Sequence, residues 1–221
     1  FSIPDAANAI PGQRWQGVWV DIYVPRETAP GTYRGTVTVA GEGLEKAVLP
    51  VELTVHRAVL PDEDAVEIGL NNYGSIGRKG SAARLRYYQM ARRHRMAIHE
   101  HFIAPALANG EPVWEPYDAE MGKYFTGEAF TAKQGYRGPG EGRPAAWAYL
   151  PFETQKRHAW PMSGEAAHTA EYDKTVRRLV AEFAQHFDKQ GWTRTRLMFF
   201  INGLDEPTKS EAMEDIRYFG E

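Results

Sequence analysis

The sequence predicts a β-sandwich followed by an α/β domain that forms the first half of a (β/α)8 barrel. Two observations support this fold class. Before residue 60, short apolar segments alternate with polar residues at the period of a strand, and after residue 61 strand-like runs alternate with amphipathic helices. We therefore expect a sandwich domain that lacks its first strands over residues 1–61 and a partial barrel over residues 62–221.

The first domain is built from three expected strands. Apolar residues alternate from Val18 to Val24, again over residues 33–40, and once more from Val51 to Val55. Loops rich in Pro and Gly separate these segments, and Gly41–Gly43 has the composition of a tight turn. This pattern is typical of a small antiparallel sandwich, and we expect its first strands to precede Phe1, which is not an initiator Met.

The second domain shows strands and helices in alternation. Strands are expected over 65–70, 97–103 and 197–201, and helices over 81–94 and 171–190. In the last of these helices, apolar residues recur at spacings of three and four, with Lys and Arg on the opposite face. Thr208 and Glu211 stand at capping-box spacing and predict one more helix start. Such alternation predicts βα units on a parallel sheet.

A long insertion separates the second barrel strand from the long helix. Residues 105–147 are rich in Gly, Pro and aromatic residues and show no clear periodicity. In a barrel this segment would lie over the carboxyl face, where substrates bind. A complete barrel takes about 250 residues, whereas roughly 160 follow Pro61, so we expect the barrel to be incomplete in this chain.

Composition excludes several classes of protein. The 221 residues carry a net charge of −3 and contain no basic block suited to a nucleic-acid backbone. No apolar run reaches the roughly 18 residues of a membrane span. Because the chain has no Cys, it has no disulfides, no Cys-type zinc site and no thiol nucleophile.

The residues best placed for chemistry are Asp205 and Glu206. They follow the apolar run 197–201, at the strand end where barrel enzymes keep their catalytic groups. Their Cα atoms lie about 3.8 Å apart, and two carboxylates this close should have separated pKa values, leaving one protonated near neutrality. The alternative is structural: acidic residues before a helix that begins near Pro207 would simply favour its dipole.

Three sequence motifs resemble one enzyme family. The stretches 17–25 (GVWVDIYVP), 30–35 (PGTYRG) and 50–55, with Leu60-Pro61 after them, resemble the sandwich of glycoside hydrolase family 123 and its uncharacterised relatives. Residues 202–207 (NGLDEP) resemble the strand end that carries catalysis in that family. The resemblance covers both ends of the chain and is weak over residues 105–165.

The resemblance implies removal of β-linked N-acetylgalactosamine by a retaining, substrate-assisted mechanism. In this chemistry the 2-acetamido oxygen of the sugar attacks its own anomeric carbon, an exception to the usual pair of separated carboxylates. Carried over, Glu206 would act as general acid and then as base, and Asp205 would orient the acetamido group and stabilise its positive charge. The resemblance implies a glycan or glycoconjugate substrate and no cofactor.

Five other residues are candidates for substrate contact, on less specific sequence signals than the acidic pair. His101 and Tyr73 follow expected barrel strands, Asn202 precedes the acidic pair, and Tyr149 and Trp160 lie near the end of the insertion. Aromatic rings stack on sugar faces, but packing in the core is an equal alternative for them. His99 and His101 share one face of a strand without a third ligand at suitable spacing, so no metal site is predicted.

A second class of function stays open. The same scaffold could serve a noncatalytic glycan-binding or surface structural protein, as the uncharacterised relatives imply. In either case we expect a bacterial protein that is secreted, periplasmic or held at the cell surface. Hydrolysis of a different sugar is a third possibility.

Overall fold

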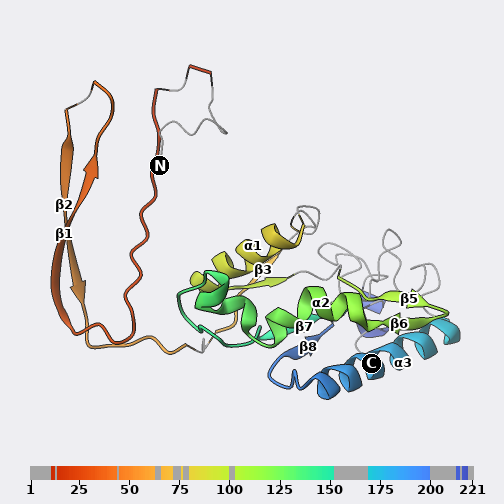
Figure 1. Cartoon of the computed structure of the whole chain (residues 1–221). Helices are drawn as coiled ribbons and strands as arrows, with labels where there is room; N and C mark the ends of the chain where they lie inside the picture. The colour runs from red at the N-terminus through yellow and green to blue at the C-terminus, as the bar shows by residue number, and fades with distance from the viewer. Residues whose placement is uncertain are drawn as a thin grey trace. The chain divides into compact units, whose positions relative to one another are not determined.

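The structure is a computed structural model of the whole chain (Figure 1). It describes residues 11–12, 14–43, 45–62, 66–71, 76, 80–99, 103–151, 169–199, 213–214 and 216–218, with the backbone alone for Asn71 and His99. The chain divides into two compact units, residues 1–60 and 61–221. The sandwich-plus-barrel architecture itself stays a prediction, because the described strands pair only two by two.

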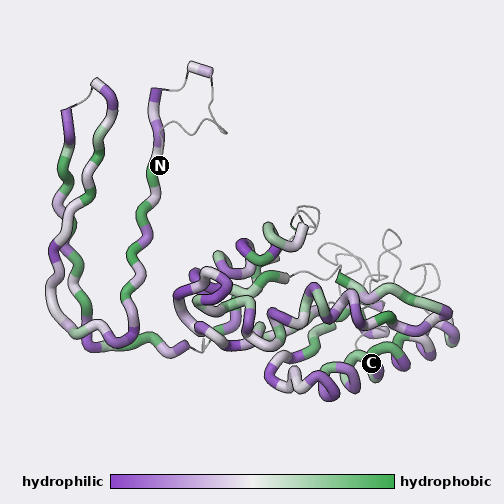
Figure 2. Tube along the Cα trace, viewed as in Figure 1, coloured by the Kyte–Doolittle hydropathy of each residue, from purple (hydrophilic) through white to green (hydrophobic). Residues whose placement is uncertain are grey.

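The first unit contains a β-hairpin. Strands β1 (Gly31–Val39) and β2 (Ala47–Val55) pair antiparallel with Gly31 opposite Val55 and Val39 opposite Ala47. Hydrophobic and more hydrophilic residues alternate over Thr36–Val39 of β1 and Val51–Val55 of β2 (Figure 2). The pairing also places Arg34 opposite Glu52, where the guanidinium Nε donates to the carboxylate at 2.9 Å. The hairpin therefore has the strand period that its sequence predicts over residues 33–40 and 51–55.

The segment before the hairpin differs from its prediction. Residues 14–24 are described but belong to no strand, although Val18–Val24 has the alternation of one. Their apolar side chains are exposed, as are several in β1 and β2. An alternating pattern becomes a strand only when a neighbouring strand supplies hydrogen-bond partners, and the described residues offer none here.

The second unit contains two β–α–β segments with parallel strands. Strand β3 (Gly69–Asn71) leads through helix α1 (Ser81–Arg93) to β4 (Ala97–His99), which lies parallel to it. Strand β7 (Trp147–Tyr149) leads through helix α3 (Ala170–Gln190) to β8 (Arg196–Met198), again parallel. Figure 1 shows both pairs beside their helices. Parallel pairs joined by helices are the units expected of an α/β domain.

Helix α3 has strong signals at both ends. The Thr169 side chain accepts a hydrogen bond from the backbone N–H of Tyr172 at 3.2 Å, and Glu171 and Asp173 favour the amino end of the helix dipole. Gly191 closes the carboxyl end with a φ of 72°, a conformation that glycine adopts without steric cost. These signals explain why the helix predicted over 171–190 is found within one residue of those bounds.

The region 105–147 is not the irregular insertion that we expected. It contains a hairpin of β5 (Ala106–Ala108) and β6 (Glu111–Val113), helix α2 (Trp114–Phe125) and the 3-10 turns η2 (Glu128–Phe130) and η3 (Ala132–Gln134). Pro116 lies in the first turn of α2, where a helix tolerates proline.

The core of the second unit lies between α2, α3 and strands β7 and β8. It is dominated by aromatic rings, among them Trp114 and Phe183, whose centroids lie 4.9 Å apart at an angle of 86°. Its buried members are Tyr117, Met121, Tyr124, Phe125, Ala129, Phe130, Tyr136, Ala145, Ala148, Leu150, Leu179, Phe183, Phe187 and Trp192. Much of this core therefore comes from the region that sequence reasoning left irregular.

Polar contacts join the helices across this core. The imidazole of His186 on α3 stacks on Trp114 with centroids 3.9 Å apart, and its Nε2 lies 2.8 Å from Asp118 Oδ1 on α2. Arg178 of α3 donates to the Gly110 carbonyl at 2.8 Å and thereby fixes the tip of the β5–β6 hairpin. Residues 105–147, which we expected to form an irregular insertion, are therefore an integral part of the second unit.

Candidate functional site

The candidate site lies at the carboxyl edge of the parallel strands. Register places Asn71 beside His99 at the ends of β3 and β4, and Tyr149 beside Met198 at the ends of β7 and β8. In open and closed α/β sheets, ligands bind at this edge because the loops that follow the strands meet there. The chain reaches Asp205 and Glu206 seven and eight residues after Met198.

The two faces of these strands have different surroundings. Leu70 and Ile98 pack with Ala91 of α1, whereas Ala148 and Leu197 pack into the aromatic core beside α3. Because side chains alternate along a strand, their neighbours Trp147 and Tyr149 face the other way. The helices therefore cover one face, and the opposite face is where a barrel interior would lie.

A small residue lets the two strand pairs approach each other on that face. A Cβ atom placed on Gly69 would lie 3.6 Å from Cζ2 of Trp147 and 3.9 Å from the hydroxyl oxygen of Tyr149. This is ordinary van der Waals distance, so β3 lies directly against the side chains of β7. The strand pairs β3–β4 and β7–β8 are thus neighbours in space.

Trp147 and Tyr149 supply aromatic surface and neutral hydrogen-bonding groups. Their rings meet edge to face, with centroids 6.3 Å apart at 83°. Burial raises the pKa of Tyr149, so its phenol is protonated at neutral pH and can donate a hydrogen bond. The indole Nε1 of Trp147 is buried and has no acceptor among the described residues. Such groups suit a neutral polar ligand with a carbon-rich face, as sugars have.

Of the predicted site residues, the structure describes Tyr149. It places this residue at the carboxyl edge, half-buried beside Trp147. The remaining candidates lie outside the described residues: Tyr73, His101, Trp160, Asn202, Asp205 and Glu206. Their roles stay predictions.

The described residues contain no group of three or more acidic, His or Cys side chains arranged to hold a metal ion. Within the same part of the chain, no helix has the length and apolar character needed to cross a membrane.

Two features escaped the sequence interpretation. Strand β7 was not predicted, because it is only three residues long and begins at the end of the expected insertion 105–147. Its Trp-Ala-Tyr composition is nevertheless typical of a strand. The β5–β6 hairpin was also missed, and here Asn109-Gly110 was an available signal. Both residues have positive φ, 53° and 84°, as a two-residue type I′ turn requires.

Comparison with known proteins gives one match. Residues 2–41 match the family model described as the glycoside hydrolase 123 N-terminal domain. No curated protein and no solved structure gives a significant match. The matched residues include the motifs at 17–25 and 30–35 and extend through strand β1. The N-terminal part of this chain is therefore related to the N-terminal domain of glycoside hydrolase family 123, which confirms the resemblance predicted from the motifs at 17–25 and 30–35. The motifs at 50–55 and 202–207 lie outside the match.

Proposed function

We propose that the protein is a retaining glycoside hydrolase that removes β-linked N-acetylgalactosamine by substrate-assisted catalysis. The observation that carries the proposal is the match of residues 2–41 to the N-terminal domain of family 123. Two features of the second unit support it. The Asn202–Pro207 motif follows parallel strand β8, and the neighbouring strand β7 carries the aromatic rings of Trp147 and Tyr149.

In the proposed first step, the carbonyl oxygen of the sugar's 2-acetamido group attacks the anomeric carbon. The bond to the leaving oxygen breaks, and Glu206 transfers its proton to that oxygen. Asp205 accepts a hydrogen bond from the acetamido N–H and stabilises the positive charge that spreads over the oxazolinium ring. The sugar supplies the nucleophile, so the protein needs no carboxylate at the distance typical of a covalent intermediate.

In the second step, Glu206 acts as base. It takes a proton from a water molecule, whose oxygen attacks the anomeric carbon and reopens the oxazolinium ring. Two displacements at one carbon restore the original anomeric configuration. Trp147 and Tyr149 would flank the sugar with apolar surface, while the Tyr149 hydroxyl offers a neutral donor to a sugar oxygen.

The test is a panel of aryl β-N-acetylhexosaminides assayed with the protein and with Asp205→Asn. We expect turnover of the N-acetylgalactosaminide and loss of most of it in the variant, since the acetamido group would lose its orienting carboxylate. A matched control is Asp188→Asn, which removes an acidic side chain from the last turn of α3. Equal activity of Asp205→Asn and the unchanged protein would reject the proposed role.

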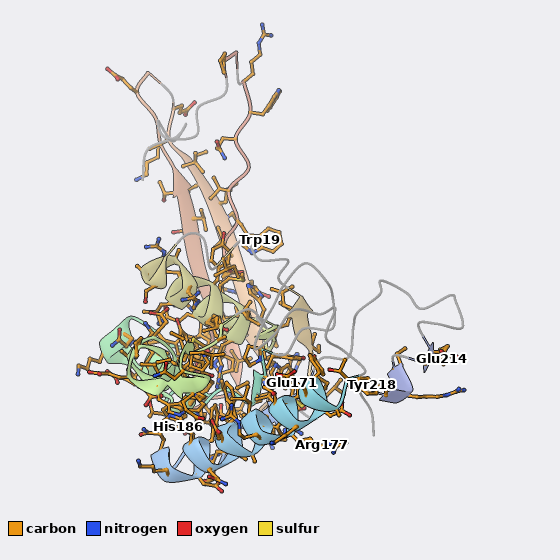
Figure 3. All side chains as sticks on the ribbon, turned by 90° about the vertical axis from the view of Figure 1, so that its right-hand side faces the viewer. Trp19, Glu171, Arg177, His186, Glu214 and Tyr218 are labelled. Atoms are coloured by element: carbon orange, nitrogen blue, oxygen red, sulfur yellow. The ribbon has the colours of Figure 1, made fainter. Side chains whose placement is uncertain are left out.

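One observation favours a noncatalytic glycan-binding module instead. Trp15 and Trp19 in the first unit are 88% and 86% exposed, and Figure 3 shows Trp19 projecting from its extended segment. Exposed indoles are a common platform for sugar rings. Saturable glycan binding without turnover, lost in Trp19→Ala, would establish this second function.

A further inference from the structure

A cavity lies at the amino end of the parallel strands, opposite the proposed glycosidase site. It has a volume of about 350 Å³, and its walls include Ile68, which precedes β3, and the first residues of β4, β7 and β8, namely Ala97, Trp147 and Arg196. The proposed glycosidase site lies beyond the last residues of these strands. The cavity therefore lies at the other end of the strands from that site, and Trp147 borders both.

The charges around this cavity are strongly unbalanced. Five guanidinium groups line it, against two carboxylates. The arginines are Arg92, Arg95, Arg143, Arg194 and Arg196, and the acids are Asp62 and Glu67. The whole chain carries a net charge of −3, so this excess of three positive charges is local. A concave surface lined by one sign of charge concentrates ions of the other sign.

One wall of the cavity is held by Arg92. Its two terminal nitrogens donate to the carbonyl oxygens of Gly140 and Pro144, at 3.3 and 2.8 Å, and its guanidinium carbon lies 3.9 Å from the ring centre of Phe130. Gly140 in turn donates its backbone N–H to Asp62 Oδ1 at 3.2 Å. These three contacts hold the guanidinium in place through neutral groups, two carbonyls and an aromatic ring.

The other side of the cavity offers donors to a ligand. Arg196 pairs with Glu67, but the two side chains are 57% and 44% exposed, and ion pairs exposed to water contribute little. An incoming anion could therefore replace Glu67 at small cost.

We propose that this cavity binds a small organic anion through its carboxylate or phosphate group. Arg143, Arg194 and Arg196 would donate to the anion, because the planar guanidinium matches two oxygens of either group at once. Tyr88 and Phe130 would cover the apolar part of the ligand. The volume falls within the range of about 300–1,000 Å³ that is typical of sites for small molecules.

The proposal is tested by titration calorimetry with inorganic phosphate and, separately, citrate at constant ionic strength. The variant is Arg143→Gln combined with Arg194→Gln. The control is Arg177→Gln, which removes one positive charge from an exposed position on α3 outside the cavity (Figure 3) and is matched in charge by Arg194→Gln alone. We expect the double variant to bind about tenfold more weakly or worse, since it loses two charged donors, and the control to bind as the unchanged protein does.

Each outcome decides the matter. Binding of phosphate alone assigns a phosphorylated ligand, binding of citrate alone assigns a carboxylate, and loss of either in the double variant supports the site. Absence of binding for both anions up to about 10 mM, or equal binding by the double variant, overturns it. If the double variant does not fold, as judged by circular dichroism, Arg194→Gln alone replaces it, because Arg194 is exposed.

Discussion

The two units of the chain differ in how much of their own apolar surface they bury. In residues 14–60 the apolar side chains are largely exposed, including Leu49 at 53% and Val48 at 53%. In the second unit, Tyr124, Leu179 and Phe183 are almost completely buried. Yet the family match covers residues 2–41, which lie in the first unit. A recognisable motif and a self-sufficient core are therefore separate properties of a sequence.

The largest expected effect on stability comes from truncating a core side chain of the second unit, and it tests the difference in burial between the two units. Phe183→Ala removes a ring that is 1% exposed and packs against Trp114 and Tyr117, so we expect a loss of about 3–5 kcal/mol in the free energy of unfolding. Leu49→Ala in the hairpin should cost about 0.5 kcal/mol or less, because surface truncations are nearly neutral. Urea unfolding followed by circular dichroism measures both.

A large cost for Leu49→Ala would break the contrast. It would mean that the hairpin face carrying Leu49 is buried against another surface in solution. A small cost for Phe183→Ala would show that the aromatic core is loosely packed.

An intermediate effect is expected from the cap of α3. Thr169→Ala removes the side-chain acceptor of the Tyr172 N–H and should cost about 1 kcal/mol. Thr169→Ser keeps an oxygen at the same position and should retain most of that stability. Thermal unfolding compares the two variants, and identical midpoints would show that the hydroxyl does not cap the helix.

The smallest effect concerns pH. Desolvation opposes ionisation of Glu120, but hydrogen bonds from Ser81 and Arg84 outweigh it and lower the pKa of this carboxyl below its ordinary value of 4.5. A lowered pKa in the folded state stabilises the fold above the ordinary value, and that contribution is lost as the pH falls through the lowered one. For this partly exposed pair we expect less than about 1 kcal/mol.

Comparing Glu120→Gln with the unchanged protein between pH 6 and pH 3 measures this contribution. The variant should lose less stability on acidification. Parallel pH profiles would show that the contacts between α1 and α2 do not depend on the charge of Glu120.

Sequence patterns predicted the elements with strong local signals and missed those that depend on tertiary packing. Helix α3 was predicted because its apolar spacing and end signals agree. Strand β7 was missed because three residues carry no measurable period, and its role arises from pairing with β8 across the intervening helix. Helix α2 was missed because Tyr117, Met121 and Tyr124 form a helical stripe inside a segment whose composition resembles a loop.

The candidate sites show the same difference between features with a local sequence signal and features that arise only from tertiary packing. Tyr149 was predicted as a substrate contact because it is an aromatic residue near the end of the insertion, whereas its position at the carboxyl edge arises from the pairing of β7 with β8. The cavity at the opposite edge brings together arginines from positions 92 to 196, and no local pattern marks them as neighbours. Charge that gathers through folding is visible only in three dimensions.

The central claim is that Glu206 donates a proton to the leaving oxygen of a β-linked N-acetylgalactosaminide. The most direct measurement is kcat/KM of Glu206→Gln on two substrates, one with an activated aryl leaving group and one with a natural sugar leaving group. We predict a loss of about 10²–10⁴-fold on the natural glycoside and a much smaller loss on the activated one, which needs little protonation. Equal losses on both substrates would contradict the acid role.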